Sequence, residues 1–461
     1  MGADVAADRP PVTRELARFV ADYPAARVGE RAATEVGRAV LDLLGVMVAG
    51  SAEPAARLMV DFAVGQGAVG DIPVLGAGVR LAPAMAALAN GTAGHALDYD
   101  DIGLRAGHVS TAIVPAALAM AEHTGASGRD TVAALALGYE VTNRLTRLYP
   151  SNLAGPYRHG YHKPSVYSVF GATAAAGRLA GLDAAGLATA FGIAASQSGG
   201  LRVNFGTMTK PMHAGNANRT AVEAVTLAGL GFTASDVALE GRYGWFDALC
   251  RGEGGLGEVL ADQDGPLAIE QGMTYKAYPC CGANHYAIDG VLWLMSEAGL
   301  CGDQVDRVEV DIHGPYLDDV LIYPWPRSGL EGKFCLPFTV AAAMVDGAVT
   351  VRTFTDDTVA RLASSRPKVR VYADPGLATD VVRVRIQTSD GRRLAHEHST
   401  LRGSLEHPLS WAELVDKFAE NCAGRIGQGA VADVVAGVEK LVTLDSVRPI
   451  TERLLCERRP G

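Results

Sequence analysis

Length, composition and charge exclude several classes of protein before any motif is considered. The chain has 461 residues, of which 48% are hydrophobic and 20% charged, as is typical of a globular protein with a large core. Its formal net charge of −10 argues against nucleic acid and anionic membrane surfaces as partners. Without a run of about 18 apolar residues we expect no membrane span. Without a signal-peptide pattern or a regular cysteine spacing we expect a cytoplasmic protein.

Apolar residues at helical spacing dominate the first half of the chain. Val36, Val40, Leu43, Leu44 and Met47 recur every three or four positions, as on the buried face of a helix. The same pattern predicts further helices over 82–98, 111–124, 129–147, 166–181, 184–197 and 217–231. No alternation typical of strands precedes residue 265, so we expect this half to be entirely helical.

The pattern changes after a linker that we place at 262–266. Apolar and polar residues alternate, as in half-buried strands, in three later segments: 308–312, 369–371 and 382–386. Helical spacing returns from Ser410 to the C-terminus. The sequence therefore predicts a mainly α protein with a large all-helical domain and a smaller inserted α+β domain. The limits that we expect are 1–265 and 400–461 for the helical domain and 266–399 for the α+β domain.

The Gly-rich segment 199–219 combines cationic side chains with a predicted helix start. Lys210 and His213 precede an apolar helical pattern that we expect to begin just after Gly215. The first N–H groups of a helix lack partners inside the helix and favour anions. With a lysine beside them they would form an anion site, although a Gly-rich turn with a surface lysine is the alternative.

A second polar cluster lies at 94–110. Asp98, Asp100 and Asp101 follow a predicted helix, and His95 and His108 flank them. Carboxylates and histidines near apolar helices are the groups used in general acid–base catalysis. A solvated, Asp-rich helix end is the alternative. The magnesium-binding pattern DDxxD is not completed here, because a leucine stands at its last position.

Two further segments place basic groups before predicted helices. His159 and His162 precede the helix predicted at 166–181, and Lys276, Cys281 and His285 precede a later one. A histidine at a helix N-terminus tends to be neutral, so it can accept a proton. No nucleotide-binding motif, nucleophile elbow or metal-ligand spacing is present. We therefore expect chemistry without a metal or organic cofactor.

The motifs GHALDYDD, GYHKP, TKPMHAGNANR and YKAYPCCGANH, in this order, resemble those of the MmgE/PrpD family. The resemblance covers about residues 12–420. It implies a homodimer without a cofactor, whose pocket lies between the two domains and takes a small di- or tricarboxylate. Carried over position by position, it assigns these residues to the active site: Asp98, His108, His162, Lys210, Lys276 and His285. His213, Cys281 and Phe338 are the further residues that we expect to bind substrate.

Three positions depart from the decarboxylase-type members of that family. Those members carry a threonine where this chain has Ile102, a histidine at Cys281 and a tyrosine at Phe338. Because two proton donors are lost, we expect proton abstraction α to a carboxylate, followed by dehydration or epimerisation. The alternatives are a decarboxylase of the cis-aconitate type and an inactive carboxylate-binding protein.

Roles in the expected reaction follow from the charge and acid–base character of these side chains. Lys210 and Lys276 would hold the carboxylates and stabilise the developing negative charge. His162 or Asp98 would be the base, and His108 the acid.

Overall fold

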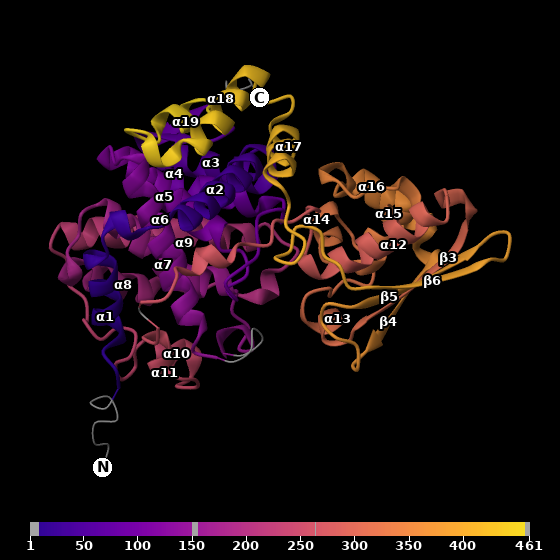
Figure 1. Cartoon of the computed structure of the whole chain (residues 1–461), viewed down its shortest axis with the longest axis horizontal. Coiled ribbons are helices and arrows are strands. Elements are labelled where there is room, and N and C mark those ends of the chain that lie inside the picture. Colours follow the sequence, from indigo (N-terminus) through magenta and orange to yellow (C-terminus); the bar gives the residue numbers. More distant parts are fainter. Residues whose placement is uncertain (1–8, 150–154, 263, 457–461) are drawn as a thin grey trace, which may run out of the picture.

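The computed structural model describes residues 9–149, 155–262 and 264–456. It is mainly α, as predicted, and it has two hydrophobic cores. The larger core is built from residues 12–275 together with 409–454, and the smaller from residues 280–386. Figure 1 shows the corresponding helical body and a smaller body of helices and strands beside it. The exact domain limits given above remain predictions, and residue 263 of the expected linker lies outside the described residues.

Long helices form most of the larger body. In chain order they are α1 (Val12–Asp22), α2 (Glu30–Gly50), α3 (Pro54–Gly65), α4 (Pro83–Ala96), α5 (Val114–Thr124), α6 (Gly128–Thr146), α7 (Lys163–Leu179), α8 (Ala184–Gln197) and α9 (Thr209–Gly229), followed by the short α10 (Trp245–Cys250) and α11 (Leu256–Val259). The C-terminal helices α17 (Trp411–Cys422), α18 (Gln428–Glu439) and α19 (Arg448–Glu452) lie against this body, and α17 packs on α2.

The first half of the chain is not entirely helical. Strands β1 (Val69–Val74) and β2 (Val79–Leu81) pair in an antiparallel sheet, so the expectation of an all-helical first half is wrong. Strand β2 has only three residues, and Pro73 interrupts the apolar residues of β1. Strand β2 is too short to show an alternating pattern and β1 is interrupted, which explains why the sequence did not reveal the pair.

Helix α9 begins at Thr209, seven residues before the start that we expected just after Gly215. Gly215 is therefore an interior residue of the helix, and Lys210 and His213 lie in its first turns. A Cβ atom at Gly215 would clash with the carbonyl oxygen of Leu88, and one at Gly91 would lie 2.9 Å from the Cα of Gly215. The glycine thus serves the close packing of α9 on α4 rather than a turn.

The smaller body is a four-stranded sheet with helices packed on it. Its strands are β3 (Val305–His313), β4 (Val369–Asp374), β5 (Val382–Thr388) and β6 (Arg393–His398), in the order β4-β3-β5-β6. Strand β3 is parallel to β4 and antiparallel to β5, and the three predicted strands are confirmed. Helices α12 (His285–Glu297) and α15 (Leu336–Asp346) pack on the sheet. Three short helices complete this body: α13 (Pro315–Asp319), α14 (Gly329–Gly332) and α16 (Asp356–Leu362).

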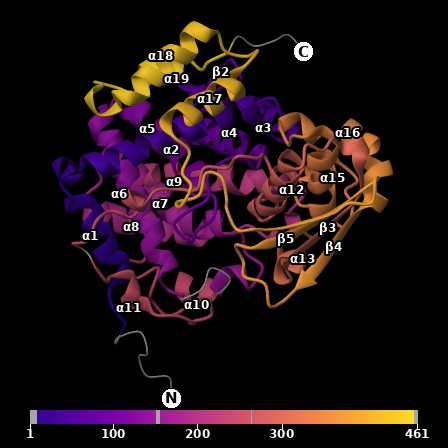
Figure 2. The same cartoon turned by 45° about the vertical axis from the view of Figure 1, so that its right-hand side comes forward.

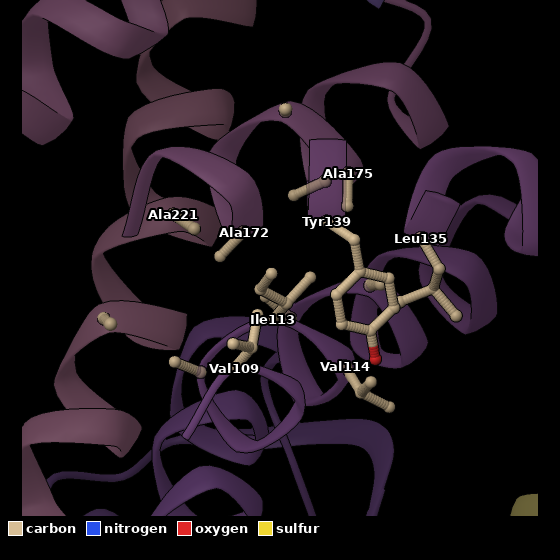
Figure 3. Packing of buried hydrophobic residues seen from close by; sticks show 14 of the residues in the cluster. Val109, Ile113, Val114, Leu135, Tyr139, Ala172, Ala175 and Ala221 are labelled. Carbon is tan, nitrogen blue, oxygen red and sulfur yellow. The ribbon is translucent and has the colours of Figure 1, made fainter. Parts of the chain in front are cut away.

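Small side chains let the helices of the larger core approach closely around a few large ones. Figure 3 shows the Tyr139 ring of α6 surrounded by Leu135, Ile113, Val114 and Ala175. The Tyr139 hydroxyl is fully buried, and it pairs with the Ser110 hydroxyl at 2.7 Å. Among the described residues, no single helix is long and apolar enough to cross a membrane, and α2 and α3 would qualify only as a pair bent by 83°.

Candidate active site

Asp98 lies at the centre of a buried ion cluster. It follows the C-terminal end of α4 and has a left-handed backbone conformation with φ of 53°, which is uncommon for a residue other than glycine. The Nζ atom of Lys210 lies 2.7 Å from its Oδ2 atom, and that of Lys276 lies 2.5 Å from Oδ1. Lys276 also donates to the carbonyl oxygens of Asp98 and Cys280. These contacts hold the strained backbone in place.

The two lysines keep Asp98 ionised. Burial opposes the charged form, but Lys210 and Lys276 outweigh it and hold the pKa of Asp98 well below its usual value. Burial likewise opposes the charged form of Lys276, and Asp98 reverses the effect and raises the pKa of that lysine. An ionised carboxylate so strongly stabilised is a poor proton acceptor at neutral pH.

Four histidines lie beside this ion cluster. The ring centroids of His95 and His108 are 4.4 Å apart, and those of His95 and His162 are 5.6 Å apart. His213 faces His162, with 3.2 Å between their Nδ1 atoms. The Nε2 atom of His108 lies 3.4 Å from Oδ1 of Asp98. The cluster therefore joins segments from α4, α7, α9 and the loop before α5.

Burial keeps these imidazoles neutral. It lowers the pKa of His95 and of His213 to about 4 each, and that of His162 well below its usual value. The positive charge of Lys210 adds to the effect at all three. Since His162 and His213 face each other through Nδ1, one of the two nitrogens carries a proton and the other accepts it.

An aromatic wall covers Lys210. The rings of Phe205 and Phe334 stack with their centroids 5.8 Å apart. The Nζ atom of Lys210 lies 5.6 Å from the first centroid and 5.0 Å from the second, close enough for cation–π attraction. His162 packs edge-on against Phe205. The wall contains residues from both bodies and excludes water from one side of the ion cluster.

The segment before α12 carries the other predicted residues. His285 is the first residue of α12, and its Nε2 atom lies 3.3 Å from the carbonyl oxygen of Cys280. Burial lowers the pKa of His285 to about 3. Cys281 is partly exposed, and burial, followed by the charge of Asp98, raises the pKa of its thiol.

The structure does not bring Phe338 to this cluster. Its side chain is fully buried in the smaller core. The ring packs edge-on against Trp325 and Phe354, with centroids 5.9 and 6.1 Å away. Its described ring neighbours are aromatic, and the expectation that Phe338 binds substrate stays a prediction.

Sequence reasoning missed Lys333, which follows α14. Its Nζ atom donates to the carbonyl oxygens of Leu97 and Pro279, at 2.8 and 2.9 Å. Burial lowers the pKa of this lysine to about 8, although Glu53 and Asp98 act in the opposite direction. Lys333 thus ties the residue before Asp98 to the residue before Cys280. A lysine directly before the apolar run FCLPF was the available signal.

One group of side chains has the spacing of metal ligands. His95, Asp100 and His108 can place one ligand atom each within 4.8 Å of one another. The Nδ1 atoms of His95 and His108 lie 3.0 and 3.1 Å from the Asp100 carboxylate. These are hydrogen-bond distances, so the contacts within the group are explained without an ion.

Comparison with known proteins gives consistent matches along the chain. Residues 14–255 match the MmgE/PrpD N-terminal domain and residues 278–440 the MmgE/PrpD C-terminal domain. The cis-aconitate decarboxylase of Mus musculus is 29% identical over 404 residues, which are 81% of this chain and 79% of the relative. That of Homo sapiens is 28% identical over 397 residues, with 82% and 80% covered. One from Aspergillus terreus is 24% identical over 424 residues, with 83% of each covered.

The two domain matches together span most of the chain. They include Asp98, Lys210 and the four histidines, and Lys276 lies in the short gap between them. The chain belongs to the MmgE/PrpD family.

Proposed function

We propose that this chain is a lyase that decarboxylates cis-aconitate or a close analogue of it. The observation that carries the proposal is the pair of buried lysines, Lys210 and Lys276, that share Asp98 beside four histidines. This site offers cations for substrate carboxylates and imidazoles for proton transfer. The curated relatives, which are cis-aconitate decarboxylases, favour the alternative of the sequence analysis over dehydration or epimerisation. The homodimer and the cytoplasmic location expected above belong to the same proposal.

The absence of a tyrosine hydroxyl at position 338 is no objection to the proposed decarboxylation. A tyrosine at this position was expected to donate a proton at the active site. The Phe338 ring instead lies in the smaller core between aromatic side chains. A hydroxyl group missing at that place removes no donor from the ion cluster.

Decarboxylation of cis-aconitate needs a proton at one carbon and charge stabilisation at another. Breaking the bond between the methylene carbon and its carboxylate releases CO₂. The electron pair of that bond forms a new terminal double bond, and the pair of the old double bond takes a proton at its far carbon. The product is itaconate. Lys210 and Lys276 would stabilise the negative charge that spreads toward the remaining carboxylates.

The proton would come from a histidine that the substrate itself helps to charge. Burial and the lysines lower the pKa of His108 and of His162 and keep both imidazoles neutral. A bound carboxylate adds negative charge beside them, and an opposite charge within a few ångströms favours the protonated form. His108 and His162 would then gain a proton on substrate binding and deliver it to carbon. Asp98 acts as an ionic partner in this scheme, because its charge is too strongly stabilised for a base.

One observation supports a second candidate reaction, which is dehydration or epimerisation. A Cβ atom at Gly282 would lie 2.7 Å from Cδ1 of Ile102, so Ile102 borders the segment that carries Cys281. Two of the three departures from the decarboxylase-type pattern are therefore neighbours in space. They would reshape the same side of the site and change which carboxylate fits there.

Proton NMR in D₂O separates these reactions. The purified chain is incubated with cis-aconitate and, separately, with hydroxylated and aminated di- and tricarboxylates. Itaconate carrying one deuterium at its saturated methylene group would support the proposal. Deuterium exchange without net change would mark an epimerase, and a new alkene from a hydroxy acid would mark a dehydratase. Binding without turnover on the whole panel would contradict a lyase and leave a carboxylate-binding protein. Lys440→Met, at an exposed position, is the matched control for lysine variants.

A further inference from the structure

Asp100 is a fully buried carboxylate to which the reaction above gives no role. Its oxygen atoms lie 3.0 and 3.1 Å from Nδ1 of His95. Its Oδ2 atom lies 3.1 Å from Nδ1 of His108. One carboxylate therefore contacts the same nitrogen of two imidazoles, and both imidazoles border the proposed site.

The charge of Asp100 fixes which of these atoms carry protons. Burial opposes its ionised form, but His95 and then His108 outweigh burial, and the pKa of Asp100 lies well below its usual value. An ionised carboxylate only accepts hydrogen bonds. The Nδ1 atom of His95 must therefore donate to it. The Nδ1 atom of His108 lies 3.1 Å from Oδ2 without hydrogen-bond geometry, and the negative charge beside it favours an N–H group there. A neutral imidazole has a single N–H group, so the Nε2 atoms of both rings would then carry lone pairs.

The two Nε2 atoms differ in their surroundings. The Nε2 atom of His108 lies 3.4 Å from Oδ1 of Asp98. In the Nδ1–H tautomer the lone pair of Nε2 faces this carboxylate oxygen, so the negative charge of Asp98 favours protonation of Nε2. Burial, Lys276 and Lys210 oppose a positive charge on His108 and lower its pKa, whereas Asp100 and Asp98 favour the charge. The Nε2 atom of His95 is buried without a hydrogen-bond partner in the described chain. His162 stacks on this ring.

We propose that Asp100 is a positioning residue that holds His95 and His108 as Nδ1–H tautomers and turns both Nε2 atoms toward the substrate. The inference rests on the proposed function, because it names the residue that prepares the acid of that reaction. His108 takes a proton from solvent on Nε2 when a substrate carboxylate arrives, and it delivers that proton to the far carbon of the old double bond. Asp100 stabilises the imidazolium through Nδ1 and remains ionised throughout. His95 offers a second acceptor for a substrate or water hydrogen.

Asp100→Asn tests the inference with almost no change in shape. The amide oxygen can accept from one Nδ1–H group, but the amide nitrogen donates, so the other imidazole must change to its Nε2–H tautomer. General acid–base groups contribute about 10²- to 10⁴-fold to a rate, so we expect kcat to fall by at least about 100-fold with KM little changed. The acidic limb of the pH–rate profile should move as well. Full kcat in Asp100→Asn would overturn the inference.

A spectroscopic measurement decides the inference without any activity. Long-range ¹H–¹⁵N correlation spectra of the ligand-free chain, assigned with His95→Gln and His108→Gln, report the tautomer of each imidazole. We expect both histidines as Nδ1–H. The matched control is Asp101→Asn, because Asp101 is equally buried but contacts Ser110 and no histidine. It should leave both tautomers unchanged, whereas Asp100→Asn should change at least one.

The two kinds of failure are distinguishable. Nε2–H tautomers in the native chain would overturn the role of Asp100 even if cis-aconitate is turned over. Nδ1–H tautomers in a chain that turns over no polycarboxylate would support the placement of Asp100 and contradict the proposed function. If Asp100→Asn does not fold, the spectra of the native chain still decide the tautomers.

Discussion

Lys210 and Asp98 form an ion pair of 2.7 Å although 112 positions separate them in the sequence. Asp98 follows the end of α4 and Lys210 lies in the first turn of α9. These two helices make the most extensive contact between helices in the described chain. Their packing therefore decides where the two charges meet, and removal of either charge leaves the other buried.

The first prediction concerns the loss of that lysine. Lys210→Met should lower kcat/KM on cis-aconitate by roughly 10- to 100-fold, because a hydrogen bond to a charged group contributes about 1.5–3 kcal/mol. Both kcat and KM should change, since the charge on the carboxylates grows in the transition state. Steady-state rates of itaconate formation measure this. Lys440→Met, which is exposed, should behave as the native chain. An unchanged kcat/KM in Lys210→Met would remove Lys210 from the site.

The second prediction tests the position of Phe338. Phe338→Tyr places a hydroxyl group in a fully buried aromatic environment. A buried polar group without a partner costs about 1–3 kcal/mol, so urea unfolding should show a lower free energy of unfolding by about that amount. Decarboxylation should not increase. A gain in itaconate formation would show that the ring does reach the substrate, contrary to the structure.

The third prediction is a dependence of stability on pH. The pKa of His285 is lowered to about 3 in the folded chain, whereas an unperturbed histidine has a pKa near 6.5. The unfolded chain therefore binds this proton first as the pH falls. The stability that neutral His285 contributes is fully present above about pH 6.5. It is lost as the pH falls from there toward its folded pKa of about 3.

Chemical unfolding at a series of pH values checks this sign. Between these two pKa values, one proton changes the free energy of unfolding by about 1.4 kcal/mol per pH unit. His285→Gln keeps a donor for the Cys280 carbonyl oxygen but cannot bind the proton, so its stability should fall less steeply toward acid. His123→Gln, at an exposed position, serves as the control. Equal slopes for the native chain and His285→Gln would contradict the prediction.

The fourth prediction is that chelators leave the activity unchanged. The contacts of Asp100 with His95 and His108 have hydrogen-bond distances, and they compete with any cation for the same nitrogens. Dialysis against EDTA, followed by metal analysis and an assay, tests this. If activity is lost and Zn²⁺ or Mg²⁺ restores it, the three side chains His95, Asp100 and His108 would be the first metal site to examine.

Much of the fold could be predicted from the sequence because helical and strand periodicities follow directly from burial. The alternation in β3 and β5 places Val308, Val310 and Val384 inward, and all three are buried. Strand β6 was missed, since most of its residues are exposed or only partly buried. Gly215 was misread as marking a helix start, because a sequence does not show which neighbour requires a missing side chain.

The candidate site was predictable in its members and not in their pairing. The sequence indicated that Lys210 and Lys276 would be cations near a helix start, free for a substrate. In the structure both bind Asp98, a contact between distant segments that no local pattern encodes. Lys333 was missed for the same reason, since its partners are backbone carbonyl oxygens that carry no mark in the sequence.

The close approach of α4 and α9 has a consequence for engineering of this enzyme. Replacing a helix-interior glycine with alanine usually stabilises a protein by about 0.5–1 kcal/mol, so Gly91 and Gly215 would be natural targets in a search for heat-resistant variants. Here a methyl group at Gly215 would meet the carbonyl oxygen of Leu88 and force the helices apart. The added methyl group would therefore lower both the thermal stability and the turnover rate. A library built on helix propensity alone should therefore leave these two glycines untouched.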